Sequence, residues 1–295
     1  MFIRRSTDRG PVIASGSVPD IAGEAELRAW VEVLSVPRHF HFESNDNRRV
    51  ALWLMDRLRG WGYEAAFHGE ARNVIAMPAG LRGPVVLVGA HYDSVPGCPG
   101  ADDNASAVAA LLAVAQACAG RDPRPRVAFA AFNREEDGLI GSTEFVGDTL
   151  PTLPWQVTRV HILEMVGFAL HEPGSQRIPE GLPITLPDTG DFLGLLANGA
   201  SARLLAEVLA HARGGQPDFP VLGLEVRLGL DRLLPVLRRS DHVPFWEKHI
   251  PALMWTDTSE FRNPHYHQPS DTPDTLDYHF LRRVAQLLTQ VVLAG

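Results

Sequence analysis

GAHYDSVPGCPGADDNASAVAALL, residues 89–112, is the stretch from which the fold of this chain can be predicted. It begins at the end of an apolar, β-branched run, passes through a loop rich in Gly and Pro, and continues into an alanine-rich run of helical character. Strand-like and helix-like runs alternate in the same way along the rest of the chain. Such alternation predicts an α/β fold in which a mostly parallel central sheet carries helices on both faces, in three layers.

The expected elements follow from the period at which apolar residues recur. Helices are expected over residues 24–34, 47–61, 105–119, 141–146, 204–212 and 276–294, and strands over 73–77, 85–89, 127–132, 160–166 and 250–255. Residues 1–22 are rich in Gly, Pro and Ser and predict a loosely ordered arm. Residues 23–295 are expected to form a single catalytic domain, in which the irregular segment 168–239 supplies loops around a substrate pocket.

The composition excludes several classes of protein. The 295 residues are 45% hydrophobic and 21% charged, which is ordinary for a globular protein, and the formal net charge of −8 argues against a nucleic-acid-binding surface. Two cysteines, Cys98 and Cys118, make no disulfide scaffold. No apolar stretch is long enough to span a membrane, and the N-terminal residues lack the apolar region of a secretory signal, so a cytoplasmic location is expected. The sequence does not indicate an oligomeric state.

His91 and Asp93 follow the apolar run VVLVGA. Two residues that are separated by one position on extended backbone point in the same direction. A histidine that binds a metal usually donates its other ring N–H to a carboxylate or a carbonyl, and Asp93 is placed for this. An ordinary hydrogen bond at the end of a strand is the alternative interpretation.

Asp102 and Asp103 stand where the next helix is expected to begin. A carboxylate there can bridge two cations, one with each oxygen, and Gly100 allows a close approach of the backbone. The simpler interpretation is that both residues are helix N-caps. We assign the bridging role to Asp103 and leave Asp102 as a cap or as a supporting group near the site.

Glu135 and Glu136 follow the buried run VAFAAF. The side chains of two adjacent glutamates diverge, so one can bind a metal while the other faces the attacking water as a general base. A solvated acidic turn is the alternative. The apolar strand before the pair and the glycines after it favour a functional site.

Glu164 lies within VHILEMVGF, where an uncompensated buried carboxylate would be costly. Metal binding is the preferred interpretation, and an ion pair with an arginine is the alternative. His161 lies three residues earlier and is expected to face away, as a packed or surface histidine. His267 lies in a proline-rich loop that suits a preorganised ligand. His265 and His242 are alternatives to it that the sequence alone does not exclude.

Together these residues resemble the zinc aminopeptidases of the co-catalytic dizinc type, peptidase family M28. The matching strings occur in the family's order between residues 89 and 272: HYDS, GADDNAS, EEDGLIGS, LEMVG, RSDHVPFW and NPHYHQPSDT. Any one string is weak evidence, whereas six in order are strong evidence. The resemblance covers most of the chain.

The resemblance implies a metal-dependent aminopeptidase that removes N-terminal residues from peptides with a free N-terminus. It implies two Zn²⁺ ions, with Co²⁺ or Mn²⁺ also acceptable to such ligands. One ion would be held by His91, Asp103 and Glu164, and the other by Asp103, Glu136 and His267. A hydroxide shared by the two ions would attack the substrate, with Glu135 as general base. Asp93 would orient His91, and Asp241 would lie beside the site.

One departure concerns the metal ligands, because Glu164 stands where the best-known enzymes of this type have the shorter aspartate. Three alternatives remain at this point. Dizinc carboxypeptidase-like or deacylase enzymes of the neighbouring family also carry an HxDxxP string, but they usually contain an inserted dimerisation domain, for which this chain lacks length. Glutaminyl-peptide cyclotransferases carry similar strings and use one zinc ion. Receptor-like relatives keep the fold without activity, but they typically lose ligands, and none of the five is missing here.

Overall fold

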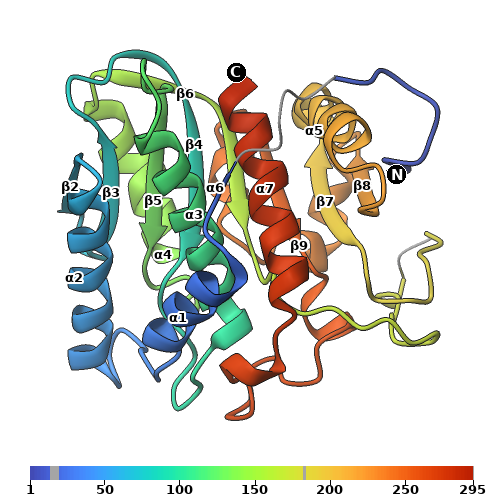
Figure 1. Cartoon of the computed structure of the whole chain (residues 1–295), viewed down its shortest axis with the longest axis horizontal. Helices are drawn as coiled ribbons and strands as arrows, with labels where there is room; N and C mark the ends of the chain where they lie inside the picture. Colours follow the sequence, from blue (N-terminus) through green and yellow to red (C-terminus); the bar gives the residue numbers. More distant parts are fainter. Residues whose placement is uncertain (14–19, 182–183, 295) are drawn as a thin grey trace.

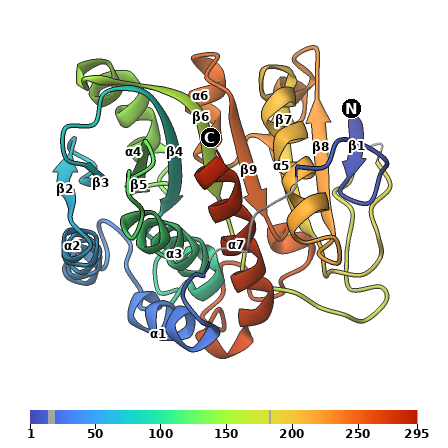
Figure 2. The ribbon, with the colours of Figure 1, turned by 45° about the horizontal axis from the view of Figure 1, so that its top comes forward.

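The computed structural model describes residues 1–13, 20–181 and 184–294, and their strands form one mixed sheet. The strands are β1 (Phe2–Arg5), β2 (Tyr63–His68), β3 (Asn73–Pro78), β4 (Gly83–His91), β5 (Val127–Phe132), β6 (Trp155–Leu163), β7 (Leu193–Asn198), β8 (Val221–Val226) and β9 (Ala252–Thr256). Their order across the sheet is β1-β8-β7-β9-β6-β4-β5-β3-β2. Figures 1 and 2 show the sheet extending across the molecule from β2 on the left to β8 on the right.

Helices lie on both faces of this sheet. They are α1 (Glu24–Leu34), α2 (Ser44–Gly60), α3 (Ala107–Ala119), α4 (Ile140–Glu144), α5 (Ala202–Gly215), α6 (His242–Glu247) and α7 (Tyr278–Ala294). The long helices share one apolar core with one face of the sheet, and α3 and α7 lie side by side across its centre (Figure 1). A second apolar core combines other residues of β4, β5 and β6 with residues of the short helix α6 and of loops. No helix of the described residues has the length and apolar character that a membrane crossing requires.

The predicted α/β fold is confirmed, but the sheet is less parallel than expected. The pairs β4–β5, β4–β6, β6–β9 and β7–β8 are parallel, and β1–β8, β2–β3, β3–β5 and β7–β9 are antiparallel. The difference has a local cause at one edge, where only residues 69–72 connect β2 to β3. A connection this short makes a hairpin, because parallel neighbours need a long crossover. The parallel pairs at the centre are the ones that carry the site.

Two parts of the expected organisation differ from the structure. Residues 2–5, within the expected N-terminal arm, form β1 and pair with β8, while residues 14–19 lie outside the described residues. The segment 168–239, expected to be irregular apart from one helix, also contains β7 and β8. Both strands contain an internal glycine, Gly194 or Gly223, and glycine weakens the strand signal in a sequence.

His161 on β6 is a packed core histidine, one of the two roles expected for it. Its ring is 1% exposed and packs edge-on against Trp255, whose Nε1 donates a hydrogen bond of 3.1 Å to His161 Nδ1. Burial lowers the pKa of His161 to about 3. The ring is therefore held neutral in the folded protein.

This histidine predicts a loss of stability in mild acid. The unfolded chain takes up a proton near the ordinary pKa of 6.5, while His161 in the folded chain resists protonation down to a pH of about 3. The free energy of unfolding therefore decreases as the pH is lowered from about 6.5 to about 3. Each pH unit is worth about 1.4 kcal/mol. Between about pH 7 and about pH 5, urea unfolding should show roughly 2 kcal/mol more loss in the wild type than in His161→Gln. Equal losses in the two proteins would contradict this assignment.

Candidate metal centre

Three neighbouring parallel strands, β4, β5 and β6, end at one edge of the sheet and carry the candidate residues there. His91 is the last residue of β4, Glu135 and Glu136 follow β5, and Glu164 follows β6 directly. The sequence placed Glu164 inside a strand, and the structure places it just beyond the strand end. The carboxyl ends of parallel strands meet at a common edge, which is where open α/β sheets bind their ligands.

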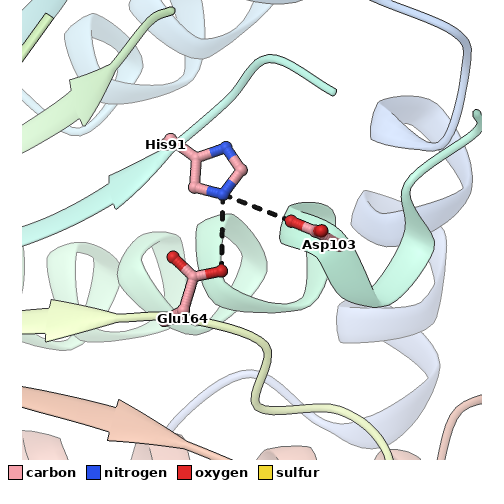
Figure 3. Close-up of side chains that lie close together, drawn as sticks. All are labelled: His91, Asp103 and Glu164. Atoms are coloured by element: carbon pink, nitrogen blue, oxygen red, sulfur yellow. Dashed lines mark ion pairs between the residues drawn. The ribbon is translucent and has the colours of Figure 1, made fainter. Parts of the chain in front are cut away.

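His91, Asp103 and Glu164 form one group of three side chains (Figure 3). His91 Nε2 lies 3.3 Å from Asp103 Oδ1 and 3.6 Å from Glu164 Oε1. Two atoms that each lie 2.0–2.1 Å from a zinc ion in tetrahedral geometry are about 3.3 Å apart. The spacing within this group therefore suits a shared metal ion.

Asp103, Glu136 and His267 form a second group. His267 Nε2 lies 3.1 Å from Asp103 Oδ2 and 3.4 Å from Glu136 Oε2. Asp103 thus belongs to both groups and turns a different carboxylate oxygen toward each imidazole. Such a carboxylate has the arrangement of a bridge between two cations, the role expected of Asp103.

Asp93 supports the site in two ways. Its Oδ1 lies 3.4 Å from His91 Nδ1, as expected for a carboxylate that orients the ring. Its two oxygens also accept hydrogen bonds from the backbone N–H groups of Glu135, at 3.2 Å, and Glu136, at 3.3 Å. One buried carboxylate therefore holds the loop of the two glutamates against the end of β4. The sequence indicated only the first of these contacts.

Four buried polar atoms of the centre make no hydrogen bond among the described residues: both ring nitrogens of His91, Asp103 Oδ1 and Glu136 Oε1. Of these, His91 Nδ1 still faces a carboxylate, that of Asp93 at 3.4 Å, so the case for a metal rests on the other three. Buried polar groups are normally paired, because an unpaired one costs free energy. All four belong to side chains that bind zinc well. This chemistry and the spacing of the donors fit a metal centre.

The carboxylates also determine how the two histidines titrate. Burial disfavours the charged ring of His91, but Glu164 and Glu135 outweigh burial and raise its pKa well above the ordinary value. Burial opposes the charged ring of His267 too, yet Asp103 and Glu136 raise its pKa to about 10. The negative field that holds protons on these rings also attracts metal cations, so protons and metal compete for the same nitrogens.

Glu135 is buried, with 8% of its surface exposed. It lies close enough to His91 and Glu136 for one ligand atom from each to fall within 4.8 Å of the others. Burial raises the pKa of Glu135 well above its ordinary value, opposed by His91 and reinforced by the charges of Glu164 and Glu136. Burial, together with the charge of Asp103, likewise raises the pKa of Glu136 to about 7. A carboxylate with a raised pKa is a better proton acceptor near neutral pH.

Asp102 is a supporting group and not the side-chain cap of α3. Its carboxylate accepts hydrogen bonds from Gly167 N, at 2.9 Å, and Asn263 Nδ2, at 2.7 Å. The backbone N–H groups of Asp102 and Asp103 are bound instead by Asp271, at 2.9 and 3.1 Å. Asp271 lies within the string NPHYHQPSDT, but nothing in the sequence assigned it this contact.

The structure distinguishes His267 from His242 and His265, the two alternative candidates for a metal ligand that the sequence did not exclude. His242 is buried against Trp246, and its Nε2 lies 3.0 Å from the carbonyl of Leu237. His265 is turned toward Ser270, with Nδ1 2.9 Å from the hydroxyl. Neither belongs to a group of possible metal ligands among the described residues.

The RSDH string also contributes to the centre. Ser240 donates a hydrogen bond of 2.6 Å to Glu164 Oε2, which leaves the other oxygen for the group around His91. Asp241 is fully buried beside the centre, as expected, and burial raises its pKa to about 7, opposed by His91.

Arg38 is a buried residue of the site that sequence reasoning missed. Its guanidinium donates hydrogen bonds to the carbonyls of Tyr92, at 2.6 Å, Gly100, at 2.9 Å, Val36, at 3.2 Å, and Pro99. It thereby joins the two ends of the loop that separates His91 from Asp103. A lone arginine directly after Pro37 gives no sequence signal for this role.

The same loop explains why a glycine stands at position 100. Gly100 has a φ of +59°, a region that favours glycine, and a Cβ there would lie 2.2 Å from the carbonyl oxygen of Asp103. The close approach expected at this position is therefore present. The missing side chain also leaves room for the guanidinium of Arg38, whose Nη1 would lie 3.2 Å from such a Cβ.

A buried amide network links this loop to that of the two glutamates. Asn47 Nδ2 donates to the carbonyl of Arg38 and to Asn133 Oδ1, both at 2.9 Å. Asn73 in turn accepts from the backbone N–H of Asn133 and donates to the carbonyl of Gly141. The segment of Arg38 and the loop that carries Glu135 and Glu136 are thus held by one set of hydrogen bonds.

Comparison with known proteins agrees with this geometry. Residues 73–178 and 231–292 match the family model described as Peptidase family M28. The chain belongs to peptidase family M28. It is 33% identical to YfbL of Escherichia coli, described as an uncharacterized protein, over 76% of this chain and 70% of YfbL. It is 28% identical to the aminopeptidase YwaD of Bacillus subtilis, over 75% of this chain and 44% of YwaD, so it spans less than half of that relative.

Solved structures share the fold of this chain. LapB from Legionella pneumophila superposes with a TM-score of 0.70 at 20% identity, over 92% of this chain and 71% of LapB. A glutaminyl cyclase from Porphyromonas gingivalis superposes with a TM-score of 0.63 at 17% identity, over 95% of this chain and 99% of that chain. At these identities the likeness concerns the fold alone. The family expected from the six strings is confirmed, and with it the expectation of a peptidase-type enzyme.

Proposed function

We propose that this chain is a zinc-dependent aminopeptidase with two metal ions. The observation that carries the proposal is the position of Asp103, whose two oxygens face two different imidazoles in two complete groups of ligands. The aminopeptidase YwaD among the curated relatives supports the reaction. Bound zinc supplies polarisation of the scissile carbonyl and a lowered pKa of the attacking water.

Residues of the chain would bind the metal ions, transfer the proton and bind the substrate. His91 and Glu164 would hold one ion, Glu136 and His267 would hold the other, and Asp103 would be shared by both groups. The carboxylate of Glu135 accepts the proton of the attacking water and returns it to the leaving amine. The surrounding acidic groups attract the cationic α-amine of a peptide with a free N-terminus, which directs cleavage to the first residue.

An apolar pocket beside the centre suits the side chain of that residue. Glu164 and Ser240 lie at the wall of this pocket, and the wall continues with Met254, Leu196 and Phe192. Burial of an apolar side chain there stabilises the bound substrate in proportion to the area removed from water. We therefore expect a preference for apolar N-terminal residues.

A glutaminyl-peptide cyclotransferase is the second candidate, since one shares the fold. Such an enzyme needs only one zinc ion. Here the second group, Asp103, Glu136 and His267, is as closely spaced as the first, and this favours the two-ion aminopeptidase.

Elemental analysis together with a substrate panel tests the proposal. We expect about two zinc ions per chain, and faster hydrolysis of leucyl and phenylalanyl chromogenic amides than of aspartyl or lysyl amides, by tenfold or more (roughly, from the area buried). The N-acetylated leucyl amide serves as control and should resist cleavage. One zinc ion per chain, with pyroglutamate formed from glutaminyl peptides, would establish the cyclotransferase instead.

A further inference from the structure

The apolar pocket is a trough that continues across the sheet, away from the metal centre. Its floor includes a row of side chains on four adjacent strands. Met254 on β9 pairs with Leu196 on β7, Leu196 with Leu224 on β8, and Leu224 with Ile3 on β1. Residues that pair across neighbouring strands point to the same face, and all four line the pocket.

The trough is much longer than one side chain. Adjacent strands are 4.7–4.9 Å apart, so the three steps from β9 to β1 extend about 14 Å. Leucine or phenylalanine at the metal centre would fill only the first part of that length. The remainder suits a linear apolar group that continues beyond β7 toward β1.

A glycine opens the trough at the level of the metal centre. Thr256 on β9 pairs with Gly194 on β7, and Gly194 pairs with Leu222 on β8. The missing side chain of Gly194 leaves space between Thr256 and Leu222, and a Cβ there would lie 3.2 Å from the carbonyl oxygen of Thr256. An apolar group can therefore pass from the centre over β7 toward β8.

The two helices nearest to the trough, α5 and α6, do not fill it. α5 lies on the opposite face, because a Cβ at Gly223 would meet the side chain of Leu205 on α5. α6 packs on β6 and β9. The described lining of the trough also includes residues of connecting segments and of the short 3-10 helix Pro235–Leu237: Pro179, Ile184, Leu186, Val236 and Leu237.

Charge is confined to the end at the metal centre. The charged side chains of the described lining are Glu164, Arg239 and Glu260. Arg239 pairs with Glu260 and donates a hydrogen bond of 2.7 Å to the hydroxyl of Tyr266. Tyr266 stacks on His267 with ring centroids 3.8 Å apart, which places this polar cluster beside the centre. The trough is therefore polar at its reactive end and apolar at its far end.

We propose that this enzyme hydrolyses amides whose acyl side carries a linear alkyl chain longer than any coded side chain, with the chain lying along the trough toward Ile3. The proposal rests on the proposed function for its hydrolytic centre. Water adds its oxygen to the acyl carbon, the C–N bond breaks, and the amine leaves with a proton. An α-aminoalkanoyl group and a plain alkanoyl group share this chemistry, so the test includes both.

The first test is a homologous series of anilides. One arm carries α-amino groups, from alanyl through norvalyl and norleucyl to aminooctanoyl and aminodecanoyl. The other carries propanoyl to decanoyl groups without an amine. We expect kcat/KM in at least one arm to rise about threefold to fourfold per methylene beyond norleucyl or hexanoyl length. A maximum at leucine length followed by decline in both arms would overturn the proposal.

The two arms also separate this proposal from the proposed function. Cleavage of the amine-bearing arm alone supports both proposals, and cleavage of the plain alkanoyl arm alone supports the trough while contradicting the aminopeptidase. If neither arm is cleaved, binding decides. Titration calorimetry with decanoic and butanoic acids should show tighter binding of decanoic acid by tenfold or more, roughly, from the added apolar area. Equal affinities for the two acids would overturn the proposal that the trough binds an alkyl chain.

Substitution at the far end locates the alkyl chain. Leu224→Trp and Ile3→Trp should each fill the trough and lower the ratio of kcat/KM for the longest to the shortest substrate by about tenfold or more. Leu52→Trp is the matched control, because Leu52 is 41% exposed on α2 at the other end of the sheet. An unchanged ratio in both trough variants, folded as judged by circular dichroism, would contradict the assignment.

Discussion

Replacement of Glu135 by glutamine is expected to lower kcat by about 10³-fold or more, because the amide cannot accept a proton from the attacking water. Glu135 suits this role for two reasons. Asp93 holds its backbone N–H, which positions the side chain against His91 and Glu136. Burial raises the pKa of Glu135, which makes its carboxylate a stronger base than an exposed glutamate. Glutamine has nearly the same volume, so the loss should be in kcat and not in folding.

The matched control is the same change one residue later. Glu136→Gln alters a side chain whose Oε2 lies 3.4 Å from His267, so it should reduce zinc content as well as turnover. Glu135→Gln should keep its zinc, measured by elemental analysis after gel filtration. Undiminished turnover in Glu135→Gln would remove this residue from the mechanism. Zinc loss in Glu135→Gln with full zinc in Glu136→Gln would exchange the two roles.

The arrangement of the first half of the site could be predicted from sequence because each candidate ends an apolar strand. His91 is the last residue of β4, and Glu135 and Glu164 follow β5 and β6. Parallel strands bring their carboxyl ends to one edge. The predicted bounds of α1 and β5 agree with the structure for the same reason, since their apolar periodicity is regular. The local sequence pattern was therefore sufficient to predict the position of a side chain that depends on a single strand or helix.

Other features depend on tertiary contacts that leave no local pattern. His267 and His265 share one loop, and only the folded chain turns the first toward Asp103 and the second toward Ser270. Arg38 resembles any other arginine in the sequence, yet it is fully buried against carbonyls more than fifty residues away. The same holds for β7 and β8, whose glycines obscure the strand pattern while Gly194 opens the trough.

Asp103→Asn is expected to weaken the binding of both zinc ions at once, by about 10²-fold or more each, since removal even of groups that only support a ligand costs up to that amount. The reason is geometric. Oδ1 faces His91 and Oδ2 faces His267, and asparagine offers one oxygen and no charge in their place. Equilibrium titration with a chromogenic zinc chelator measures both sites.

Three further variants make this titration decisive for the number of ions. Glu164 faces His91 and Glu136 faces His267, so Glu164→Gln and Glu136→Gln should each weaken one of the two proposed sites and spare the other. Asp218→Asn is the matched control, because Asp218 is exposed and its carboxylate pairs with Arg283, away from both imidazoles. If Asp103→Asn weakens only the site that Glu164→Gln weakens, Asp103 does not bridge. The second group of ligands would then bind its metal without Asp103, or bind none.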